Sequence, residues 1–389
     1  MSLASTNDSS TSSTSNDTSS TSNDSNVSST GGAHRPQRAG GADPAVALAG
    51  APVVVRVVRS GFVESVHHAI VAVTQTSSAT ETNNATETSS RELLSRGDVT
   101  APILPRSANK PAQAVGMLRA GLDLTGRHLA LACASHSGED FHLQAVAEIL
   151  ADHGLSEADL RNTPDLPYEE HERARWLAAG RAPTSLAQNC SGKHAAMLVT
   201  CRINGWDLEG YLDPAHPLQV HLAETAADLA GEPVAATTVD GCGAPALGIS
   251  TAGLARTFGR LAAAAEGTPE RRVADAMRAH PEYVAGSTRD VTAVMRGLPG
   301  AVAKDGAEAV YAVGLADGRG VAVKIADGSQ RVRPVVLAAT LLHLGVDAPV
   351  LRDLARLPVL GHGQPVGAFE VDLDAHLADP AQRSTGSRA

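Results

Sequence analysis

Strand-like segments lie towards both ends of this chain and helix-like segments fill its middle, and this order restricts the folds open to the sequence. Residues 52–73 hold two runs rich in β-branched residues, separated by Arg-Ser-Gly, which is a hairpin pattern. Residues 308–328 predict a second hairpin that turns at Asp317-Gly318. Between them, residues 139–281 carry mostly helical patterns. We therefore predict an α+β fold, in which an antiparallel sheet from both termini is flanked by helices and a helical subdomain is inserted.

Individual segments predict further elements within this outline. Residues 128–137 are mostly apolar and small, and we expect a buried strand that runs into a polar loop. Residues 139–154 predict an amphipathic helix that ends at Gly154. Residues 244–267 predict one long helical segment, and residues 334–346 predict the last strong helix.

Two low-complexity tracts interrupt this pattern. Residues 1–45 are rich in Ser, Thr, Asn and Asp, and they cannot bury enough apolar area to offset the entropy of ordering, so we expect a disordered tail. A similar tract at residues 74–90 is expected to be a loop insertion in a hairpin. The rest of the chain predicts one domain over residues 46–365, followed by a flexible tail over residues 366–389.

Charge and composition exclude some partners. The net charge is −10, whereas nucleic acids and anionic membranes need a basic surface, so we expect neither as a partner. The first ten residues lack the basic start and apolar stretch of a secretory signal, so we expect a cytoplasmic protein. Its four cysteines are then expected to be reduced, as core residues, metal ligands or reactive thiols.

Lysine is rare in this sequence. Of 32 lysines and arginines, only Lys110, Lys193, Lys304 and Lys324 are lysine. An arginine cannot lose its proton in a protein, but a desolvated lysine can become a neutral amine that acts as a base or a ligand. The four lysines are therefore the first candidates for chemistry.

Ser107 and Lys110 form a Ser-x-x-Lys pattern directly before Pro111. Proline is tolerated in the first turn of a helix, so Ser107 is expected at a helix start. At this spacing the two side chains can meet, and a neutral Lys110 could take the proton of Ser107 during attack on a carbonyl. The alternative is a capping serine beside a solvated lysine.

Two cysteines follow in loops that also carry polar residues. Cys190 and Lys193 begin one predicted helix, and Asp240 and Cys242 lie in a glycine-rich loop. Two thiolates on separate loops suit zinc, which leaves a position for water or substrate. The alternative is that both cysteines are small buried core residues. A nucleotide loop is not expected, because Ala187 stands where the phosphate-binding pattern requires glycine.

Other polar residues are weaker candidates. Ser135 and His136 could be nucleophile and base, or they could form a turn that leads into the next helix. Lys304 closes an apolar run before a turn, where a solvated lysine is the ordinary expectation. Lys324 lies in an alternating strand and is expected to face solvent.

Five segments together resemble one known family, the rhizobial-type L-asparaginases, also called the asparaginase II family. They are residues 59–73, 105–114, 133–142, 189–198 and 239–246. The resemblance covers about residues 53–346 apart from the insertion. It implies a fold like that of serine β-lactamases and glutaminases, a homodimer, and hydrolysis of L-asparagine to L-aspartate and ammonia.

The resemblance also implies site residues. Ser107 and Lys110 match one Ser-Lys pair of the family, and Ser135 and Lys304 match a second. The family's Zn²⁺ site is matched by the residues Cys190, Lys193 and Cys242. Asp240, beside that site, and His136 are expected to bind the substrate.

One departure from the family and two other classes of protein stay open. Asp290 or Val291 stands where family members carry a further cysteine, so a third thiol is not expected at the site. A penicillin-recognising serine hydrolase would use the same Ser107 and Lys110, although its Ser-Asp-Asn and Lys-Thr-Gly motifs are absent from the sequence. A non-catalytic zinc-stabilised binding protein is the other alternative.

Overall fold

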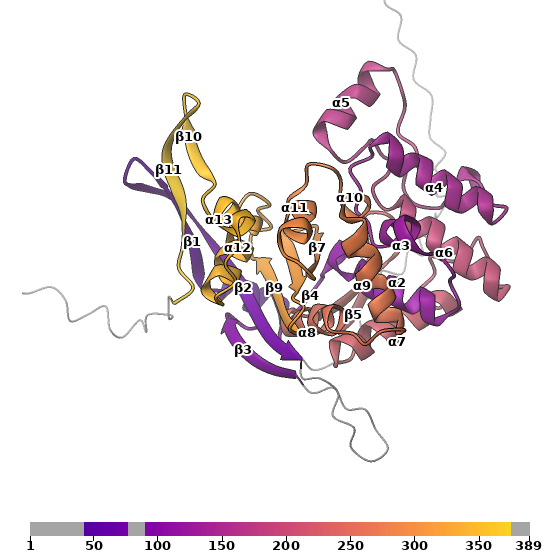
Figure 1. Ribbon diagram of the computed structural model, residues 1–389, viewed down its shortest axis with the longest axis horizontal. Coiled ribbons are helices and arrows are strands. Elements are labelled where there is room, and N and C mark those ends of the chain that lie inside the picture. Colours follow the sequence, from indigo (N-terminus) through magenta and orange to yellow (C-terminus); the bar gives the residue numbers. More distant parts are fainter. Residues whose placement is uncertain (1–42, 77–89, 375–389) are drawn as a thin grey trace, which may run out of the picture. The chain divides into compact units, whose positions relative to one another are not determined.

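The computed structural model describes residues 43–76 and 90–374. Its main sheet has eight strands in the order β10-β11-β1-β2-β9-β8-β7, with β3 paired to β2, and every pairing is antiparallel (Figure 1). The strands of this sheet are β1 (Val53–Arg59), β2 (Phe62–Thr76), β3 (Ser90–Arg96), β7 (Val302–Gly306), β8 (Val310–Gly314), β9 (Arg319–Ile325), β10 (Pro358–Gly361) and β11 (Gln364–Val371). Strands from both ends of the chain therefore share one sheet, as the sequence predicts.

A second sheet has three strands in the order β4-β6-β5. They are β4 (Pro102–Ile103), β5 (Ala236–Val239) and β6 (Pro245–Ser250). All three pair antiparallel, and β4 directly precedes the turn that carries Ser107. This small sheet thus connects the first candidate serine to the loop with Asp240 and Cys242.

Helices fill the middle of the chain, and some of them pack on the main sheet. Those in the described residues are α1 (Pro44–Ala49), η1 (Arg106–Asn109), α2 (Lys110–Arg119), α3 (Gly126–Ala132), α4 (Asp140–Asp152), η2 (Glu157–Asp159), α5 (Glu170–Ala178), α6 (Ser191–Asn204), α7 (Pro217–Ala230), α8 (Thr251–Ala262), α9 (Pro269–Ala279), α10 (Pro281–Val284), α11 (Asp290–Gly297), α12 (Arg333–His343) and α13 (Pro349–Ala355). Figure 1 shows α3, α4 and α6 grouped on one side of the molecule, away from β1, β10 and β11. None of these helices has the length and apolarity that a membrane span requires.

Close packing of α8 on the sheet depends on glycine. Helix α8 contacts β2, β8 and β9. A Cβ atom at Gly320 would lie 1.8 Å from the carbonyl oxygen of Ala255, and one at Gly314 would lie 2.0 Å from that of Phe258. A side chain at either glycine would therefore push the helix off the sheet. Strand β8 is buried at every residue, so this part of the sheet is covered on both faces.

Both predicted hairpins are confirmed. β1 and β2 flank the Arg-Ser-Gly turn, and β8 and β9 flank Asp317-Gly318. The predicted amphipathic helix ends as expected near Gly154, and the last strong helix is α12. The α+β class is therefore correct.

Three local predictions were wrong. Residues 128–132 belong to helix α3 and not to a strand, because α3 packs among α4, α6, α9 and α10 and is apolar on most sides. Residues 245–250 form strand β6, and the helix begins only at Thr251. Residues 366–371 are not a tail, because they lie in β11, which pairs with β1 and β10.

The other boundary predictions fall largely outside the described residues. Of the predicted tail 1–45, only residues 43–45 are described, and α1 begins at Pro44. Of the predicted insertion 74–90, residues 74–76 and Ser90 are described, and they belong to the paired strands β2 and β3. Residues 77–89 and 375–389 also lie outside the described part.

Candidate active site

Lys110 is the centre of the candidate site. It is the first residue of α2, and its side chain is buried, with 1% exposed. Its Nζ donates hydrogen bonds to the carbonyl oxygen of Ala134, to Oγ of Ser135 at 3.1 Å and to Sγ of Cys190 at 3.1 Å. One amine thus joins three segments that are far apart in the sequence.

Ser107 lies one turn before Lys110, in η1, and is half-buried. Its backbone carbonyl accepts a hydrogen bond from the Lys110 N–H, but no hydrogen bond in the described structure joins Ser107 Oγ to Lys110 Nζ. The residue before it, Arg106, has φ 54°, in the left-handed region. Backbone strain of this kind is frequent at functional sites.

Lys304 reaches the same region from the other sheet. Its strand β7 packs directly on η1, since a Cβ at Gly306 would lie 2.2 Å from the carbonyl oxygen of Pro105. The Lys304 side chain is fully buried, and its Nζ donates to Oδ1 of Asp305 at 2.6 Å and to the Asp305 carbonyl oxygen at 2.8 Å. Burial lowers the pKa of Lys304 to about 8; Asp305 opposes this shift and the charge of Lys110 adds to it. The expectation of a solvated lysine at this position is therefore wrong.

The structure pairs the serines and lysines differently from the pairs that the resemblance implies. Lys110 bonds to Ser135, which the resemblance assigns to the second pair. Lys304 bonds to Asp305 and makes no hydrogen bond to Ser135 in the described structure. Ser135 is 5% exposed, so Ser107 is the more accessible of the two hydroxyl-bearing residues.

The two predicted zinc-binding thiols lie together beside Lys110. Cys190 precedes α6, whose first turn packs closely on α3, because a Cβ at Gly192 would lie 2.5 Å from the Leu131 carbonyl oxygen. Cys242 hydrogen-bonds to Cys190, which lowers the pKa of Cys242 to about 4 and raises the pKa of Cys190 to about 12. The two thiols therefore titrate as a pair, in which Cys242 favours the thiolate.

Lys193 completes this group of donors. Its side chain is 2% exposed, and its Nζ lies 3.3 Å from Sγ of Cys242. Burial opposes its charge, but Cys242 and Cys190 raise its pKa more strongly. Two sulfur atoms and one nitrogen thus converge at one buried point; zinc binds thiolates readily, and the Lys193 amine could join them only after losing its proton. Within residues 43–76 and 90–374, no group of three or more His, Cys, Asp and Glu side chains could hold a metal ion.

The two residues expected to bind substrate differ in position. Asp240 lies next to the thiols and accepts from Arg106, with 2.6 Å between Nη2 and Oδ1. His136 is completely buried, and its Nε2 lies 2.8 Å from Oγ of Ser191. Burial, followed by the nearby His142 and Lys110, keeps the pKa of His136 well below its ordinary value. His136 is thus a neutral residue behind the site, with no exposed surface for a substrate.

Sequence reasoning missed a buried charge cluster next to Lys304. Asp305 is 4% exposed and accepts hydrogen bonds from Arg289 and Arg333 as well as from Lys304. The signal was present in the sequence, because Asp305 follows Lys304 directly in a segment that is otherwise apolar. Arg106 was also missed. It directly precedes Ser107, but it is not part of the Ser-x-x-Lys motif or of any other motif in the sequence.

Lys324, the fourth lysine, is also buried. It is 6% exposed and donates to the Glu308 carbonyl oxygen, so the expectation that it faces solvent is wrong. Together with Arg106 it lines a mostly apolar cavity of about 440 Å³ between β4, β6 and β9. All four lysines of the chain are therefore buried.

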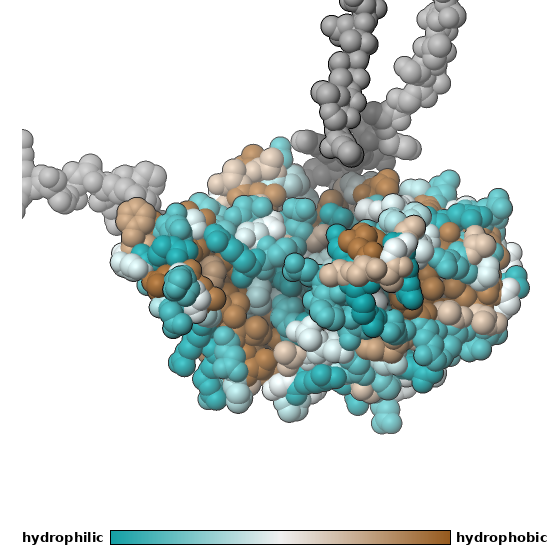
Figure 2. Space-filling model, turned by 90° about the horizontal axis from the view of Figure 1, so that it is seen from above, coloured by the Kyte–Doolittle hydropathy of each residue, from teal (hydrophilic) through white to brown (hydrophobic). Residues whose placement is uncertain are grey.

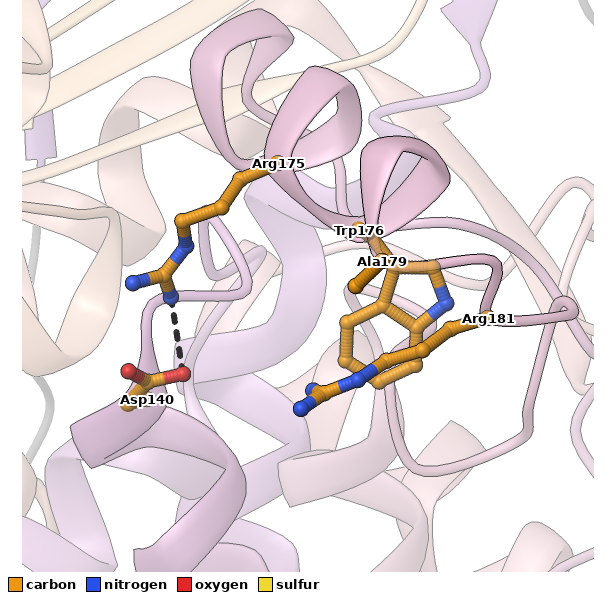
Figure 3. Close-up of a pocket in the computed structure, with 5 residues that line it drawn as sticks. All are labelled: Asp140, Arg175, Trp176, Ala179 and Arg181. Atoms are coloured by element: carbon orange, nitrogen blue, oxygen red, sulfur yellow. Dashed lines mark hydrogen bonds and ion pairs between the residues drawn. The ribbon is translucent and has the colours of Figure 1, made fainter.

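A smaller hollow lies on the surface and is separate from this site. It has a volume of about 170 Å³ and is lined by Asp140, Arg175, Trp176, Ala179 and Arg181 (Figure 3). Arg175 and Asp140 form an ion pair across it at 2.8 Å, and the Arg181 guanidinium lies 4.8 Å from the centre of the Trp176 ring. None of the candidate catalytic residues lines this hollow, so it is not the candidate active site.

Comparison with known proteins gives the class of the molecule. The model of the L-asparaginase II family matches residues 55–371, which is most of the chain. This chain belongs to the L-asparaginase II family, and it is a hydrolytic enzyme that acts on amides. No curated protein matches it.

Two solved structures show distant likeness. One is a simvastatin synthase, the LovD6 mutant of LovD from Aspergillus terreus, at 14% identity and a TM-score of 0.30, covering 74% of this chain and 90% of that one. The other is Mglu in its tris and glutamate form, at 14% identity and a TM-score of 0.29, covering 79% of this chain and 66% of that one.

Proposed function

We propose that this enzyme hydrolyses the side-chain amide of L-asparagine to L-aspartate and ammonia through an acyl-enzyme on serine. The observation that carries the proposal is the buried amine of Lys110, which lies 3.1 Å from Oγ of Ser135 and one helical turn from Ser107. A serine needs an adjacent base to act as a nucleophile, and a buried lysine amine can be that base. The membership of the L-asparaginase II family supports a small amide as the substrate.

In the proposed first step, Ser107 Oγ attacks the amide carbon and Lys110 accepts the hydroxyl proton. Ser107 is chosen because it is half-buried and can reach a substrate, whereas Ser135 is 5% exposed. Collapse of the tetrahedral intermediate breaks the carbon–nitrogen bond, and the leaving nitrogen takes a proton from Lys110 through Ser135 Oγ. Ammonia and an aspartyl ester on Ser107 are the products of this step.

In the second step, water attacks the ester carbon and the ester bond to Ser107 breaks. Lys110 accepts the water proton and the Ser107 oxygen is reprotonated, so L-aspartate leaves and the starting enzyme returns. Lys304 shares the buried region with Lys110, and each positive charge disfavours the other. Since burial lowers the pKa of Lys304 to about 8, loss of its proton above that pH would favour proton uptake by Lys110.

We further propose that Cys190, Lys193 and Cys242 hold Zn²⁺. The convergence of two sulfur donors and one amine, all at most 5% exposed, supports this ligand set. Asp240 is directed to Arg106 and is expected to orient that guanidinium, not to bind metal. Zinc, when bound, would supply positive charge that raises affinity for the substrate.

The proposed function has a direct test. Purified enzyme is assayed for ammonia release from L-asparagine and L-glutamine, and for cleavage of nitrocefin and a simple ester. Release of ammonia from asparagine, and its loss in Ser107→Ala with retained folding, is the expected result. Cleavage of nitrocefin without ammonia release would favour the penicillin-recognising alternative and overturn the proposal.

We also propose a homodimer that uses the exposed end of the main sheet. Four large apolar side chains are exposed there: Phe62 (73%), Val63 (46%), Val66 (43%) and Leu360 (52%). Phe62 is paired in register with Arg59, which also donates to the Leu360 carbonyl, so these residues are neighbours. Figure 2 shows hydrophobic surface at the end of the molecule where β10 and β11 lie. Light scattering should give twice the monomer mass, and Phe62→Ser should reduce it; a monomer at all concentrations would contradict the proposal.

We propose a cytoplasmic location for the protein. All four cysteines are free in the structure, as expected for a reducing compartment. Cell fractionation of the expressing organism tests this, and recovery outside the cytoplasm would contradict it.

A further inference from the structure

The two oxygens of the Asp305 carboxylate accept hydrogen bonds from different partners, one from Lys304 and the other from two arginines. Its Oδ1 accepts from Lys304 Nζ at 2.6 Å. Its Oδ2 accepts from Arg289 Nη2 at 2.5 Å and from Arg333 Nη1 at 3.1 Å. Burial alone would raise the pKa of Asp305, but Lys304, Arg289 and Arg333 hold it well below its ordinary value. Asp305 is therefore a fixed negative charge whose two oxygens have separate partners.

A second carboxylate, Asp290, holds one of these arginines from the other side. Asp290 Oδ2 lies 3.1 Å from Arg333 Nη2, and the two side chains are 16% and 8% exposed. Arg333 Nη1 also donates to Gln330 Oε1 at 2.7 Å, and its guanidinium lies 5.0 Å from the centre of the Tyr311 ring. Arg333 is thus fixed between two carboxylates and cannot turn without losing one of them.

Asp290 and Val291 stand where the resemblance implies a further cysteine, and the structure shows which of the two reaches this charge cluster. Val291 is completely buried among apolar residues and has no polar atom to offer. Asp290 is the first residue of α11, and its side chain enters the charge cluster. Within that cluster three cations, Lys304, Arg289 and Arg333, meet two carboxylates.

We propose that Asp290 is a positioning residue for the reaction: it holds Arg333 against Oδ2 of Asp305, so that Oδ1 stays with Lys304 and fixes that amine at the site. The proposal rests on the proposed amidase function, because it gives Lys304 a part in that reaction. Asp290 itself touches neither Lys304 nor a candidate nucleophile in the described structure. Its effect passes through Arg333 and Asp305.

Charged and titratable groups from several elements around Lys304 contribute to this balance. They are Asp305 on β7, Lys110 on α2, Arg289 and Asp290 at the start of α11, Arg333 on α12, Tyr311 on β8 and Cys133 after α3. Burial raises the pKa of Cys133 to about 12 and that of Tyr311 well above its ordinary value, so both are neutral at pH 8. The charge on Lys304 therefore depends first on its burial and then on Lys110, the arginines and the two aspartates.

Removal of Asp290 and removal of Arg333 should shift the pKa of Lys304 in opposite directions. Without Asp290, Arg333 keeps only Asp305 as a carboxylate partner and its positive charge is less compensated. The ammonium of Lys304 is then less favourable, and its pKa falls further. Without Arg333, a positive charge is lost and Asp305 is freer to stabilise the ammonium, so the pKa of Lys304 rises.

The small number of lysines allows a direct measurement. Lysine labelled with ¹³C at Cε gives signals from only four residues, and Lys304→Arg identifies one of them. In the wild type, the Lys304 signal is expected to titrate near pH 8. Asp290→Asn should move that midpoint to lower pH by about 0.5 to 1 unit, and Arg333→Met should move it to higher pH by about as much. Asp290→Glu, which restores the charge, should return the midpoint towards that of the wild type.

A matched control is Asp275→Asn, because Asp275 also pairs with two arginines, Arg271 and Arg278, but lies on the surface of α9. It should leave the Lys304 midpoint unchanged. The same midpoints should govern the acid limb of kcat/KM for L-asparagine. A midpoint that is unchanged in Asp290→Asn, or that moves in the same direction in both variants, overturns the proposal.

The NMR midpoint and the ammonia assay distinguish failure of the Asp290 proposal from failure of the proposed function. If Arg333→Met does not fold, Asp290→Asn decides alone, since a shift to lower pH supports the proposal and any other result overturns it. The NMR midpoint needs no substrate, so it tests the cluster even if no ammonia is released from asparagine. Absence of ammonia release with the expected NMR shifts would refute the proposed function and leave the link between Asp290 and Lys304 standing.

Discussion

Two buried lysines share the candidate site, but their surroundings differ in kind. Lys110 contacts a carbonyl oxygen, a hydroxyl and a thiol, and no carboxylate is among its hydrogen-bond partners in the described structure. Lys304 is bonded to a carboxylate that two arginines also hold. Both side chains are at most 1% exposed, so burial does not explain the difference.

The contacts indicate a division of labour between the two amines. A proton can pass between an amine and a hydroxyl as a bond forms or breaks, and Lys110 has such a partner in Ser135. Lys304 has a fixed ionic partner instead, which opposes the effect of burial on its pKa, and its charge acts on Lys110 at a distance. The comparison therefore predicts that substitution of Lys110 removes chemistry, whereas substitution of Lys304 changes its pH dependence.

The largest effect is expected from Lys110→Arg. Arginine keeps the positive charge but cannot give up its proton, so kcat for L-asparagine should fall by about 10²- to 10⁴-fold, the usual contribution of a general base. Steady-state ammonia release measures this change. The matched control is Lys324→Arg, because Lys324 is also buried and lies outside the site. Equal loss of activity in the two variants would show that any buried lysine is required only for folding.

Loss of metal in Cys190→Ser is the next largest expected effect. Cys190 is both a hydrogen-bond partner of Lys110 and a proposed zinc ligand, so it ties metal binding to the Lys110 side of the site. Zinc content after dialysis, measured by elemental analysis, should fall by about tenfold or more. Cys201→Ser is the control, because Cys201 lies within α6, which Cys190 directly precedes, is also buried and is not a proposed ligand. Unchanged zinc in Cys190→Ser would contradict the ligand set.

Lys304 is expected to give kcat/KM a moderate dependence on pH. With a pKa of about 8, Lys304 is neutral in about a tenth of molecules at pH 7 and in about nine tenths at pH 9. If the neutral amine favours the reaction, kcat/KM should rise by about tenfold between these values and fall as the pH is lowered through 8. Lys304→Met should remove this acid limb while activity remains measurable. A limb that persists in Lys304→Met would assign it to another group.

Local patterns in the sequence predicted the two hairpins better than the elements around them. Each hairpin joins two apolar runs by a turn that contains glycine, so each pattern had one interpretation. Helix α3 is surrounded by other helices and is therefore apolar on most sides, as a buried strand would be. Strand β11 was missed for the opposite reason, because only one of residues 364–371 has an aromatic ring and none is fully buried, so it resembles a tail.

The candidate site could be predicted in its residues but not in its contacts. The rarity of lysine singled out Lys110, Lys193 and Lys304 as candidates, and the structure buries all three side chains, whereas most cations in this chain are arginine. Spacing suggested that Lys110 would meet Ser107, but the contact is with Ser135, which α3 and the following loop bring close. Such a contact depends on the packing of segments far apart in sequence, and no short motif encodes it.

The smallest expected effect concerns Lys324, the buried lysine that belongs to neither side of the comparison. Burial lowers its pKa from the value of 10.5, so the folded protein binds fewer protons at Lys324 than the unfolded chain does. Its contribution to stability is then greatest above pH 10.5, where the unfolded chain is also neutral at this residue, and is lost as pH falls through the lowered pKa. The difference in the free energy of unfolding between wild type and Lys324→Met should therefore rise in favour of the wild type from pH 8 to pH 10.5, while kcat for L-asparagine stays within about twofold of the wild type. Urea denaturation at these pH values measures the first quantity. A constant difference would mean that burial does not disfavour the charge of Lys324. The conclusion that burial lowers the pKa of Lys304 would then lose the support of the most similar lysine in the chain.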